Sequence, residues 1–423
     1  MLVLDLKVCP VTPERQTGHH TLTIAASPVA RDELPRVGVW SVHIVEAMSH
    51  QLVAGIDVGR RGFANLNPSK QYSIMKGVVF PAVGAEPRVV DDLERPTPGT
   101  DQVLVKSIWT AINPVDTFMS ASGLLVEAWP LGLGVDAAGR VVEAGSEASS
   151  KYGFNPGDEV FGCTRLGSPG YSTCQKFFLM DARVTIPRPI NISLVEAATL
   201  GVASETACLG LFDGLHIPLP DPTNLPAIKD DEWVVVLGGA SSVGRCAIQL
   251  AMACGYHVVA SCSKNSAGIV RGLGAAPFDY KTSLEEQLKI VMDFTSGNFT
   301  KIFDAVAAEK PTLAEELFKA CKGSEKFFST TNDWSGIKDF AGGKTYAVQL
   351  GHVGRPEAEQ LNAKIEQYIP VIVGLIKAGR LQPGDFEVVG EEGFEGAIKA
   401  YNLQRSGAAG ARKVVIHLQE TEG

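Results

Sequence analysis

The sequence predicts an α/β protein that combines a small β-barrel with a doubly wound parallel sheet. One observation is a strand, a glycine turn, a helix and a second strand in succession between residues 233 and 264. Helix and strand patterns then continue to alternate, which is typical of a parallel sheet covered by helices. Short strands separated by Pro and Gly turns precede this region, and they are typical of a partly closed barrel.

Length and composition limit the classes of protein that fit. The chain has 423 residues, 45% hydrophobic and 20% charged, which fits an ordinary globular protein of two domains. A formal net charge of −9 argues against a general binder of nucleic acid or of an anionic membrane. No apolar run is long enough to span a bilayer.

The cysteines indicate the compartment. Eight of them are scattered along the chain without a C-x-x-C pair. This usage is typical of reduced thiols in a cytoplasmic enzyme, so we expect neither disulfides nor a cysteine-rich zinc site.

Residues 1–74 fit this scheme poorly. They mix short apolar pieces with scattered Pro, Arg and Gly, and they show no sustained period. They lack the basic start and single apolar block of a secretory signal, and their acidic residues count against the alternative of an organelle transit peptide. We expect a poorly structured N-terminal extension.

The barrel is predicted from strands between turn residues. We expect strands at residues 76–80, 88–90, 102–108, 133–144, 159–162 and 172–179. A helix with small residues at close-packing positions is expected over residues 194–212, followed by a Pro-rich loop over 216–232.

The glycine turn predicts an anion site. Residues 233–237 are an apolar, β-branched run, as expected of a strand buried on both faces, and GGASSVG follows directly. Gly238 permits the turn, Gly244 lets the helix approach the strand, and the helix N-terminus offers free N–H groups to a pyrophosphate. The residues expected to form this cradle are Gly239, Ala240, Ser241, Ser242, Val243 and Gly244. The alternative is a tight turn without a ligand.

The end of the second strand predicts which dinucleotide binds. An acidic residue there would bind an adenosine ribose 2′-hydroxyl, and none is present. Ser261, Ser263 and Lys264, with the adjacent Asn265, offer polar groups and a cation that suit a 2′-phosphate, so NADPH is favoured over NADH. Tyr280, at the end of a later strand, is expected to reach the same phosphate. The alternative for Ser261, Ser263 and Lys264 is that they are solvated turn residues. The alternative for Tyr280 is an interface tyrosine that is partly buried and partly exposed to water.

The remaining patterns complete the two domains. Strands are expected at residues 277–280, 301–305 and 326–329, and helices at 269–272, 284–295 and 313–321. A long helix over 358–378 precedes strands at 386–389 and 413–418, which are expected to return to the barrel. The predicted domains are therefore 75–200 with 351–423 for the barrel, and 201–350 for the nucleotide-binding sheet.

The order of these parts resembles the medium-chain dehydrogenase/reductase superfamily, from residue 75 onward. The matching segments are AINPVD (111–116), LGVDAAGRVVEAG (133–145), PGDEVFG (156–162), FDY (278–280) and FDAV (303–306). The resemblance implies a GroES-like barrel and a Rossmann NADP-binding domain. The LPDP segment and the serine-substituted turn are similar to fungal enoyl reductases that act in trans with a polyketide synthase.

The resemblance also implies roles for four further residues. Asn113 and Asp116 would lie on the cleft floor beside the nicotinamide ribose, and Thr206 would meet the nicotinamide or the substrate. Lys413 would meet a cofactor phosphate. The alternatives are a helix cap for Asp116, plain packing for Thr206 and a solvated surface position for Lys413.

Departures from the family pattern bear on the chemistry. Zinc-dependent members have a Cys and a His-Glu pair where this chain has Pro114–Asp116 and Val135-Asp136, so no zinc is expected. Residues 120–129 contain no Tyr that could donate a proton. We expect hydride transfer from NADPH to an activated C=C bond, with the proton supplied by water.

The expected function is that of a trans-acting enoyl reductase of secondary metabolism. Its substrate would be a small-molecule or carrier-bound enoyl group, and a polyketide synthase would be the partner. A free-standing quinone or enone reductase, or a non-catalytic nucleotide-binding protein of the same fold, are the alternatives, because fold does not fix function.

Overall fold

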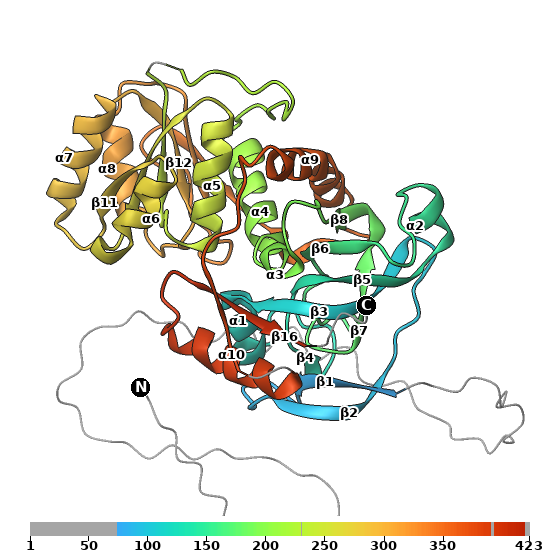
Figure 1. Cartoon of the computed structure of the whole chain (residues 1–423). Helices are drawn as coiled ribbons and strands as arrows, with labels where there is room; N and C mark the ends of the chain where they lie inside the picture. The colour runs from blue at the N-terminus through green and yellow to red at the C-terminus, as the bar shows by residue number, and fades with distance from the viewer. Residues whose placement is uncertain (1–73, 230, 391–392, 419–423) are drawn as a thin grey trace, which may run out of the picture. The chain divides into compact units, whose positions relative to one another are not determined.

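The structure is a computed structural model that describes residues 74–229, 231–390 and 393–418 (Figure 1). All of them lie within one compact unit, Pro68–Gly423. The expected N-terminal extension lies outside the described residues except for Ile74, which begins the first strand. No helix among the described residues is long and apolar enough to cross a membrane.

The barrel part contains a three-stranded and a seven-stranded sheet. The first has the order β2-β1-β4, and the second has the order β15-β16-β3-β5-β6-β8 with β7 paired to β3. The strands are β1 (Ile74–Phe80), β2 (Arg88–Glu94), β3 (Gln102–Ile112), β4 (Leu131–Gly132), β5 (Asp136–Ala144), β6 (Glu159–Cys163), β7 (Phe177–Asp181), β8 (Ile186–Pro187), β15 (Phe386–Val388) and β16 (Lys413–His417). Because β16 pairs antiparallel with β3, the C-terminal strands lie in the barrel sheet.

The nucleotide-binding part is a six-stranded, fully parallel sheet of order β11-β10-β9-β12-β13-β14. Its strands are β9 (Trp233–Leu237), β10 (His257–Cys262), β11 (Ala276–Asp279), β12 (Phe299–Asp304), β13 (Lys326–Thr330) and β14 (Gly343–Ala347). Its helices are α5 (Ser242–Ala253), α6 (Ala267–Gly272), α7 (Leu284–Thr295) and α8 (Thr312–Ala320).

Both faces of this sheet are covered, as its apolar strands predict. Val234 and Val236 of β9 pack in the core that contains α5, whereas Val235 and Leu237 pack in a separate core with α7 and α8. Side chains alternate along a strand, so a strand buried on both faces must be apolar throughout. The predicted fold class, a barrel combined with a doubly wound sheet, is confirmed. The exact domain boundaries stay predictions.

The remaining helices connect or cover these sheets. They are α1 (Pro114–Ser122), α2 (Ser146–Ser150), α3 (Leu194–Ala197), α4 (Gly201–Cys208), α9 (Glu359–Lys377) and α10 (Phe394–Ser406). Four short turns are also present among the described residues. Three are 3-10 turns, η1 (Ala182–Val184), η3 (Lys264–Ser266) and η4 (Leu350–His352), and one is a π-helical turn, η2 (Leu209–Gly214).

Three expectations for these elements need correction. The helix expected over 194–212 is divided into α3, α4 and η2, with a turn before Gly201, where a Cβ would overlap Asp136 and Gly162. The strand expected at 172–179 begins only at Phe177, and the strand expected at 133–144 begins only at Asp136. The sequence analysis did not identify α1, β14 or α10.

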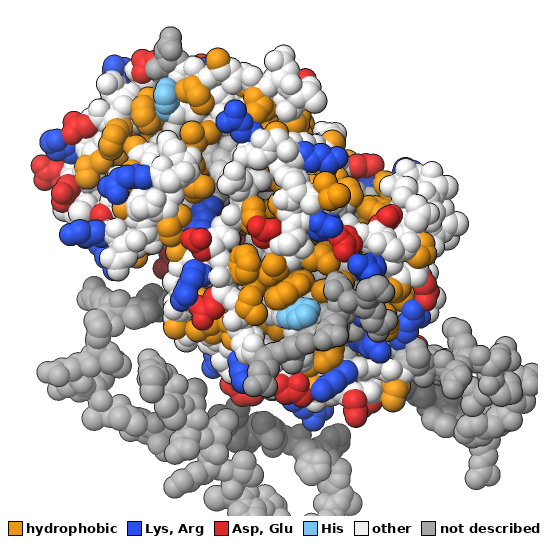
Figure 2. Space-filling model, in the orientation of Figure 1, with side chains coloured by type: hydrophobic (Ala, Val, Ile, Leu, Met, Phe, Trp, Pro, Cys, Tyr) orange, Lys and Arg blue, Asp and Glu red, His pale blue; other side chains and the backbone are white. Residues whose placement is uncertain are grey.

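The surface carries both signs of charge. On the face shown in Figure 2, Lys and Arg side chains are interspersed with Asp and Glu, and apolar side chains lie between them. This distribution on the described residues agrees with the modest negative net charge.

Candidate cofactor and substrate site

The glycine turn between β9 and α5 is formed by tight backbone packing. Gly238 has a positive φ of 82°, which glycine adopts without steric cost. A Cβ on residue 244 would overlap the carbonyl oxygen of Gly238, so only glycine fits there. Ser241 is the N-cap of α5, and its Oγ accepts a hydrogen bond of 3.0 Å from Gly244 N. The serine that replaces a glycine in this turn therefore stabilises the helix start.

A groove of about 600 Å³ lies beside this turn. Its polar lining comes from Ser241, Ser261, Ser263, Ser266 and Tyr280, and apolar lining comes from Val306 and Leu313 among others. None of the described residues that line this glycine-turn groove is acidic. Backbone donors at a helix start, surrounded by hydroxyl groups, suit a phosphorylated nucleotide.

Hydrogen bonds fix part of this lining. Ser261 Oγ accepts a bond of 2.8 Å from Gly238 N, so this side chain holds the turn against β10. Ser263 Oγ lies 3.0 Å from Ser266 Oγ. Ser266 was missed in the sequence analysis, although its place three residues after Ser263 could have indicated it.

The other predicted residues of this region lie around the groove without lining it. Lys264 and Asn265 follow Ser263 in η3, and both are exposed. Gly239 is buried and packs toward Ala260, and Ser242 and Val243 begin α5. The structure thus brings the predicted cradle and the predicted phosphate residues to one edge of the sheet. Their contacts with a cofactor stay predictions.

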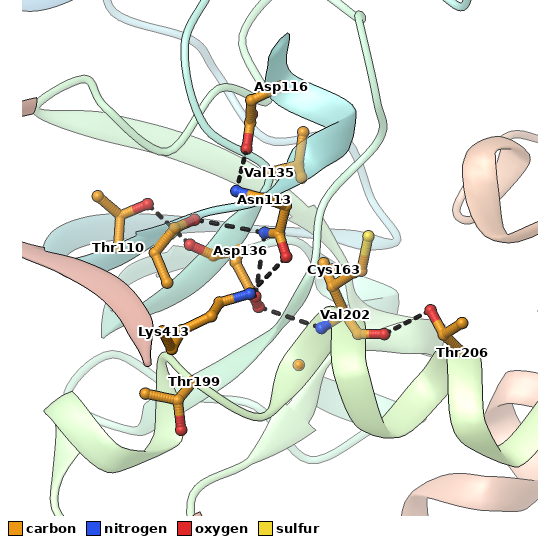
Figure 3. A network of polar contacts seen from close by, with 12 residues as sticks. Thr110, Asn113, Asp116, Val135, Asp136, Cys163, Thr199, Val202, Thr206 and Lys413 are labelled. Atoms are coloured by element: carbon orange, nitrogen blue, oxygen red, sulfur yellow. Dashed lines mark hydrogen bonds and ion pairs between the residues drawn. The ribbon is translucent and has the colours of Figure 1, made fainter. Parts of the chain in front are cut away.

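A second group of predicted residues forms a buried network in the barrel (Figure 3). Asp136, which is fully buried at the start of β5, lies 2.9 Å from Lys413 Nζ and accepts a bond of 3.2 Å from Asn113 Nδ2. Lys413 also donates to Asn113 Oδ1, and Val202 N donates to Asp136 Oδ1 at 3.1 Å. One carboxylate therefore connects β16, the β3–α1 junction and the first turn of α4.

Asp116 has the helix-capping role that was considered as its alternative. It is residue N3 of α1 in a capping box with Asn113, and its Oδ2 accepts from Asn113 N at 2.7 Å. Its Oδ1 accepts from Gly134 N at 3.1 Å. Burial raises the pKa of Asp116 to about 7, although both hydrogen bonds and the charge of Lys413 oppose the shift. Contact between Asp116 and a nicotinamide ribose stays a prediction.

Lys413 is not a solvated surface lysine, so that alternative is wrong. Its side chain is only 7% exposed, and Asp136 and Asn113 hold the ammonium group. Lys413 does not line the glycine-turn groove, although Gly410 and Ala411 do. Contact between Lys413 and a cofactor phosphate stays a prediction.

The α4 helix carries two polar side chains toward the barrel region. Thr206, which is 8% exposed, donates from Oγ1 to Val202 O at 2.6 Å. Glu205 is fully buried, and its Oε1 accepts from Cys163 N at 3.1 Å. Burial raises the pKa of Glu205 well above its usual value, which favours the neutral carboxyl group. The sequence analysis missed Glu205, although a lone acidic residue in an apolar helix was a usable signal.

No group of three or more His, Cys, Asp or Glu side chains among the described residues is arranged to hold a metal ion. Cys163 is the last residue of β6 and pairs with Asp136 of β5, and burial raises the pKa of its thiol. The absence of zinc stays a prediction.

Comparison with known proteins identifies the family. The model of the alcohol dehydrogenase GroES-like domain matches residues 99–208. The trans-enoyl reductase tazE of Aspergillus terreus is 35% identical over 211 residues, which cover 48% of this chain and 68% of the relative. The chain belongs to the medium-chain dehydrogenase/reductase superfamily.

Other relatives are similar over more of the chain. The lovastatin nonaketide synthase enoyl reductase component lovC of Aspergillus terreus is 27% identical over 341 residues, or 75% of this chain and 90% of the relative. An alcohol dehydrogenase superfamily structure from Novosphingobium aromaticivorans covers 82% of this chain and all of its own, at 24% identity and a TM-score of 0.66. The CurK enoyl reductase structure gives 0.64 at 19% identity, covering 82% of this chain and 99% of its own. These structures confirm the fold.

The family resemblance predicted from the sequence is therefore confirmed. As a member of the medium-chain dehydrogenase/reductase superfamily, the chain is an oxidoreductase of a class that uses NAD(P). The glycine-turn groove fits this cofactor class, because it is lined by the N-cap residue of α5, Ser241, together with further hydroxyl side chains, and none of the described residues in its lining is acidic.

Proposed function

We propose that this chain is an NADPH-dependent enoyl reductase that acts in trans on intermediates of a polyketide synthase. The observation that carries the proposal is its similarity to proteins of that kind. TazE is 35% identical, and the trans-enoyl reductase milB of Cordyceps militaris is 32% identical over 233 residues, or 54% of this chain and 63% of the relative. The substrate would be an enoyl thioester on a carrier.

The polar lining of the glycine-turn groove supports the choice of NADPH. The backbone of Gly239–Gly244 would bind the pyrophosphate, and Ser261, Ser263, Lys264 and Tyr280 would surround the 2′-phosphate. A carboxylate at this place would repel a phosphate, and none lines the groove. When bound, the reduced nicotinamide supplies the hydride that adds to the β-carbon of the thioester.

The residues of the chain would bind and orient the cofactor and the substrate, and they would exclude water from the site. Asp136 holds Asn113 and Lys413 in fixed orientations at the barrel side, and Thr206 lies one turn beyond Val202 on α4 (Figure 3). The carboxyl groups of Asp116 and Glu205 are both buried, and neither residue lines the glycine-turn groove. We therefore propose that water protonates the α-carbon.

The test is oxidation of NADPH by the purified chain with an enoyl thioester of pantetheine. We expect turnover with the thioester, much slower turnover with NADH, and little with simple quinones. Efficient turnover with quinones and none with the thioester would favour a quinone reductase. Tight NADPH binding without oxidation by any acceptor would favour a binding protein.

A further inference from the structure

Two exposed aromatic rings stack across the two parts of the molecule. Phe118 belongs to α1 of the barrel, and Trp334 belongs to the loop after β13 of the parallel sheet. Their ring centroids are 5.7 Å apart with an interplanar angle of 30°. Phe118 is nevertheless 38% exposed and Trp334 is 54% exposed, so each ring leaves a large apolar area open to solvent.

Both rings are presented by rigid supports. The flanking residues of Phe118 are fixed to α10, because Thr117 Oγ1 donates to Gln404 at 3.0 Å and Ser120 Oγ lies 2.9 Å from the Tyr401 hydroxyl. Trp334 follows the buried Asn332, whose side chain bonds Ala308 O at 3.0 Å and also Ser335. Such bonding shows that the exposed position of each ring is built into the fold.

Both rings belong to segments that adjoin the expected reaction site. Ligands of open parallel sheets bind at the carboxyl ends of the strands, and Trp334 follows such an end, as the glycine turn does. Phe118 is five residues after Asn113 on α1, which places it about 7–8 Å along the helix from the buried network. In Figure 1, α1 lies on the side of the barrel that faces the parallel sheet.

Two further exposed apolar side chains lie near the end of α1. Leu124 follows the end of α1 and is 48% exposed, and Val83, which is 52% exposed, lies next to Gly123. Aromatic side chains of about 150–250 Å² each that are 38% and 54% exposed leave less than about 250 Å² open, far below the area of about 1,200 Å² or more that a stable protein interface buries. The small exposed area of the ring pair therefore favours a small apolar ligand over a protein partner.

We propose that Phe118 and Trp334 form a subsite for the apolar acyl chain of the thioester substrate. The inference rests on the proposed function and deepens it. The two rings come from different parts of the molecule, so a chain that lies against both would contact the barrel and the sheet together. Length and apolar character of the acyl chain would then determine affinity.

The test uses saturated acyl-pantetheines, which bind but cannot be reduced. Butyryl, hexanoyl and octanoyl thioesters are titrated into the full chain in the presence of NADP⁺ by calorimetry. We expect the dissociation constant to fall up to about fourfold for each methylene that contacts the rings. In Phe118→Ala and Trp334→Ala this dependence on length should largely disappear, while the affinity for NADPH stays unchanged.

Two further variants keep the test decisive. Phe118→Leu retains an apolar side chain and should keep part of the dependence on chain length. Phe294→Ala removes an aromatic ring of similar exposure, 47%, from α7 and should leave the dependence intact. Equal dependence on length in the original chain and both alanine variants would overturn the subsite, as would the absence of any dependence in the original chain.

Failure of the subsite can be told from failure of the proposed function. Binding that depends on chain length, without NADPH oxidation by any enoyl thioester, would support the subsite and refute the proposed enoyl reductase activity. Turnover with affinities that do not depend on chain length would support the enoyl reductase activity and refute the subsite. If the alanine variants weaken binding of an intact carrier protein but not of any acyl-pantetheine, the ring pair is part of a protein-docking surface and the proposal is wrong.

Discussion

Replacing Asp136 by Asn should destabilise the chain strongly, because it leaves the Lys413 ammonium group buried without a carboxylate. Asp136 is fully buried and Lys413 is 7% exposed, so solvent cannot substitute for the lost partner. The amide introduced at residue 136 would also bring an NH₂ group toward Asn113 Nδ2 or Val202 N, both of which are donors.

Removing one partner of a buried, hydrogen-bonded ion pair costs about 3–5 kcal/mol. We expect Asp136→Asn to lower the free energy of unfolding by that amount in urea titrations followed by tryptophan fluorescence. Combining it with Lys413→Met should cost less than the sum of the two single changes, with a coupling of about 1–3 kcal/mol, since no unpaired charge remains.

The exposed pair Lys289–Asp293 provides the matched control. Its atoms are 2.6 Å apart, but the side chains are 72% and 60% exposed, so Asp293→Asn should leave the unfolding midpoint unchanged. Strictly additive effects at Asp136 and Lys413 would refute the reasoning, because the two groups would then not depend on each other.

Three other predictions concern single residues. Asp116 keeps its proton in the folded chain up to a pH of about 7 but loses it near 3.8 when the chain is unfolded. The free energy of unfolding, measured by urea titration relative to Asp116→Asn, should therefore fall as pH rises between these values and level off above them. A difference that stays constant with pH would contradict the raised pKa. Gly244→Ala should abolish NADPH binding in calorimetry, because the added methyl group has no room, whereas Gly268→Ala, with open space on α6, should stabilise the chain by about 0.5–1 kcal/mol. Lys264→Ala and Tyr280→Phe should each weaken NADPH by about tenfold and NADH hardly at all; equal losses would show that the phosphate assignment is wrong.

Local sequence patterns predicted the glycine turn and its sheet because they need few distant contacts. The run from β9 through α5 to β10 carries its own turn glycine, its cap and its apolar strands. Ser241 as a cap was not foreseen, although a serine before a helix is a common start signal.

The buried network could not be predicted from spacing. Asp136 and Lys413 lie far apart in the sequence, and their meeting depends on the pairing of β16 with β3. Without knowledge of the pairing between β16 and β3, a lysine near a turn is expected to be a surface residue. A solvated surface position was therefore the alternative for Lys413, and Asp136 was given no partner.

Some of the missed elements had weak signals and one had a usable signal. The strand β14 is short and begins with Gly343 at the edge of the sheet. The helix α10 carries buried Phe394, Ala397, Ala400 and Tyr401, which is a clear helical spacing that the sequence analysis overlooked.

The pairing of β3 with β16 also has a consequence for folding during synthesis. All strands of the parallel sheet come from residues 233–347, so that sheet is complete before residue 413 leaves the ribosome. The barrel must wait for β16, and its polar interior stays without its cation until then. Newly made chains that lack this strand should carry an open barrel beside a finished sheet, a state with an unpaired strand edge that chaperones would have to protect.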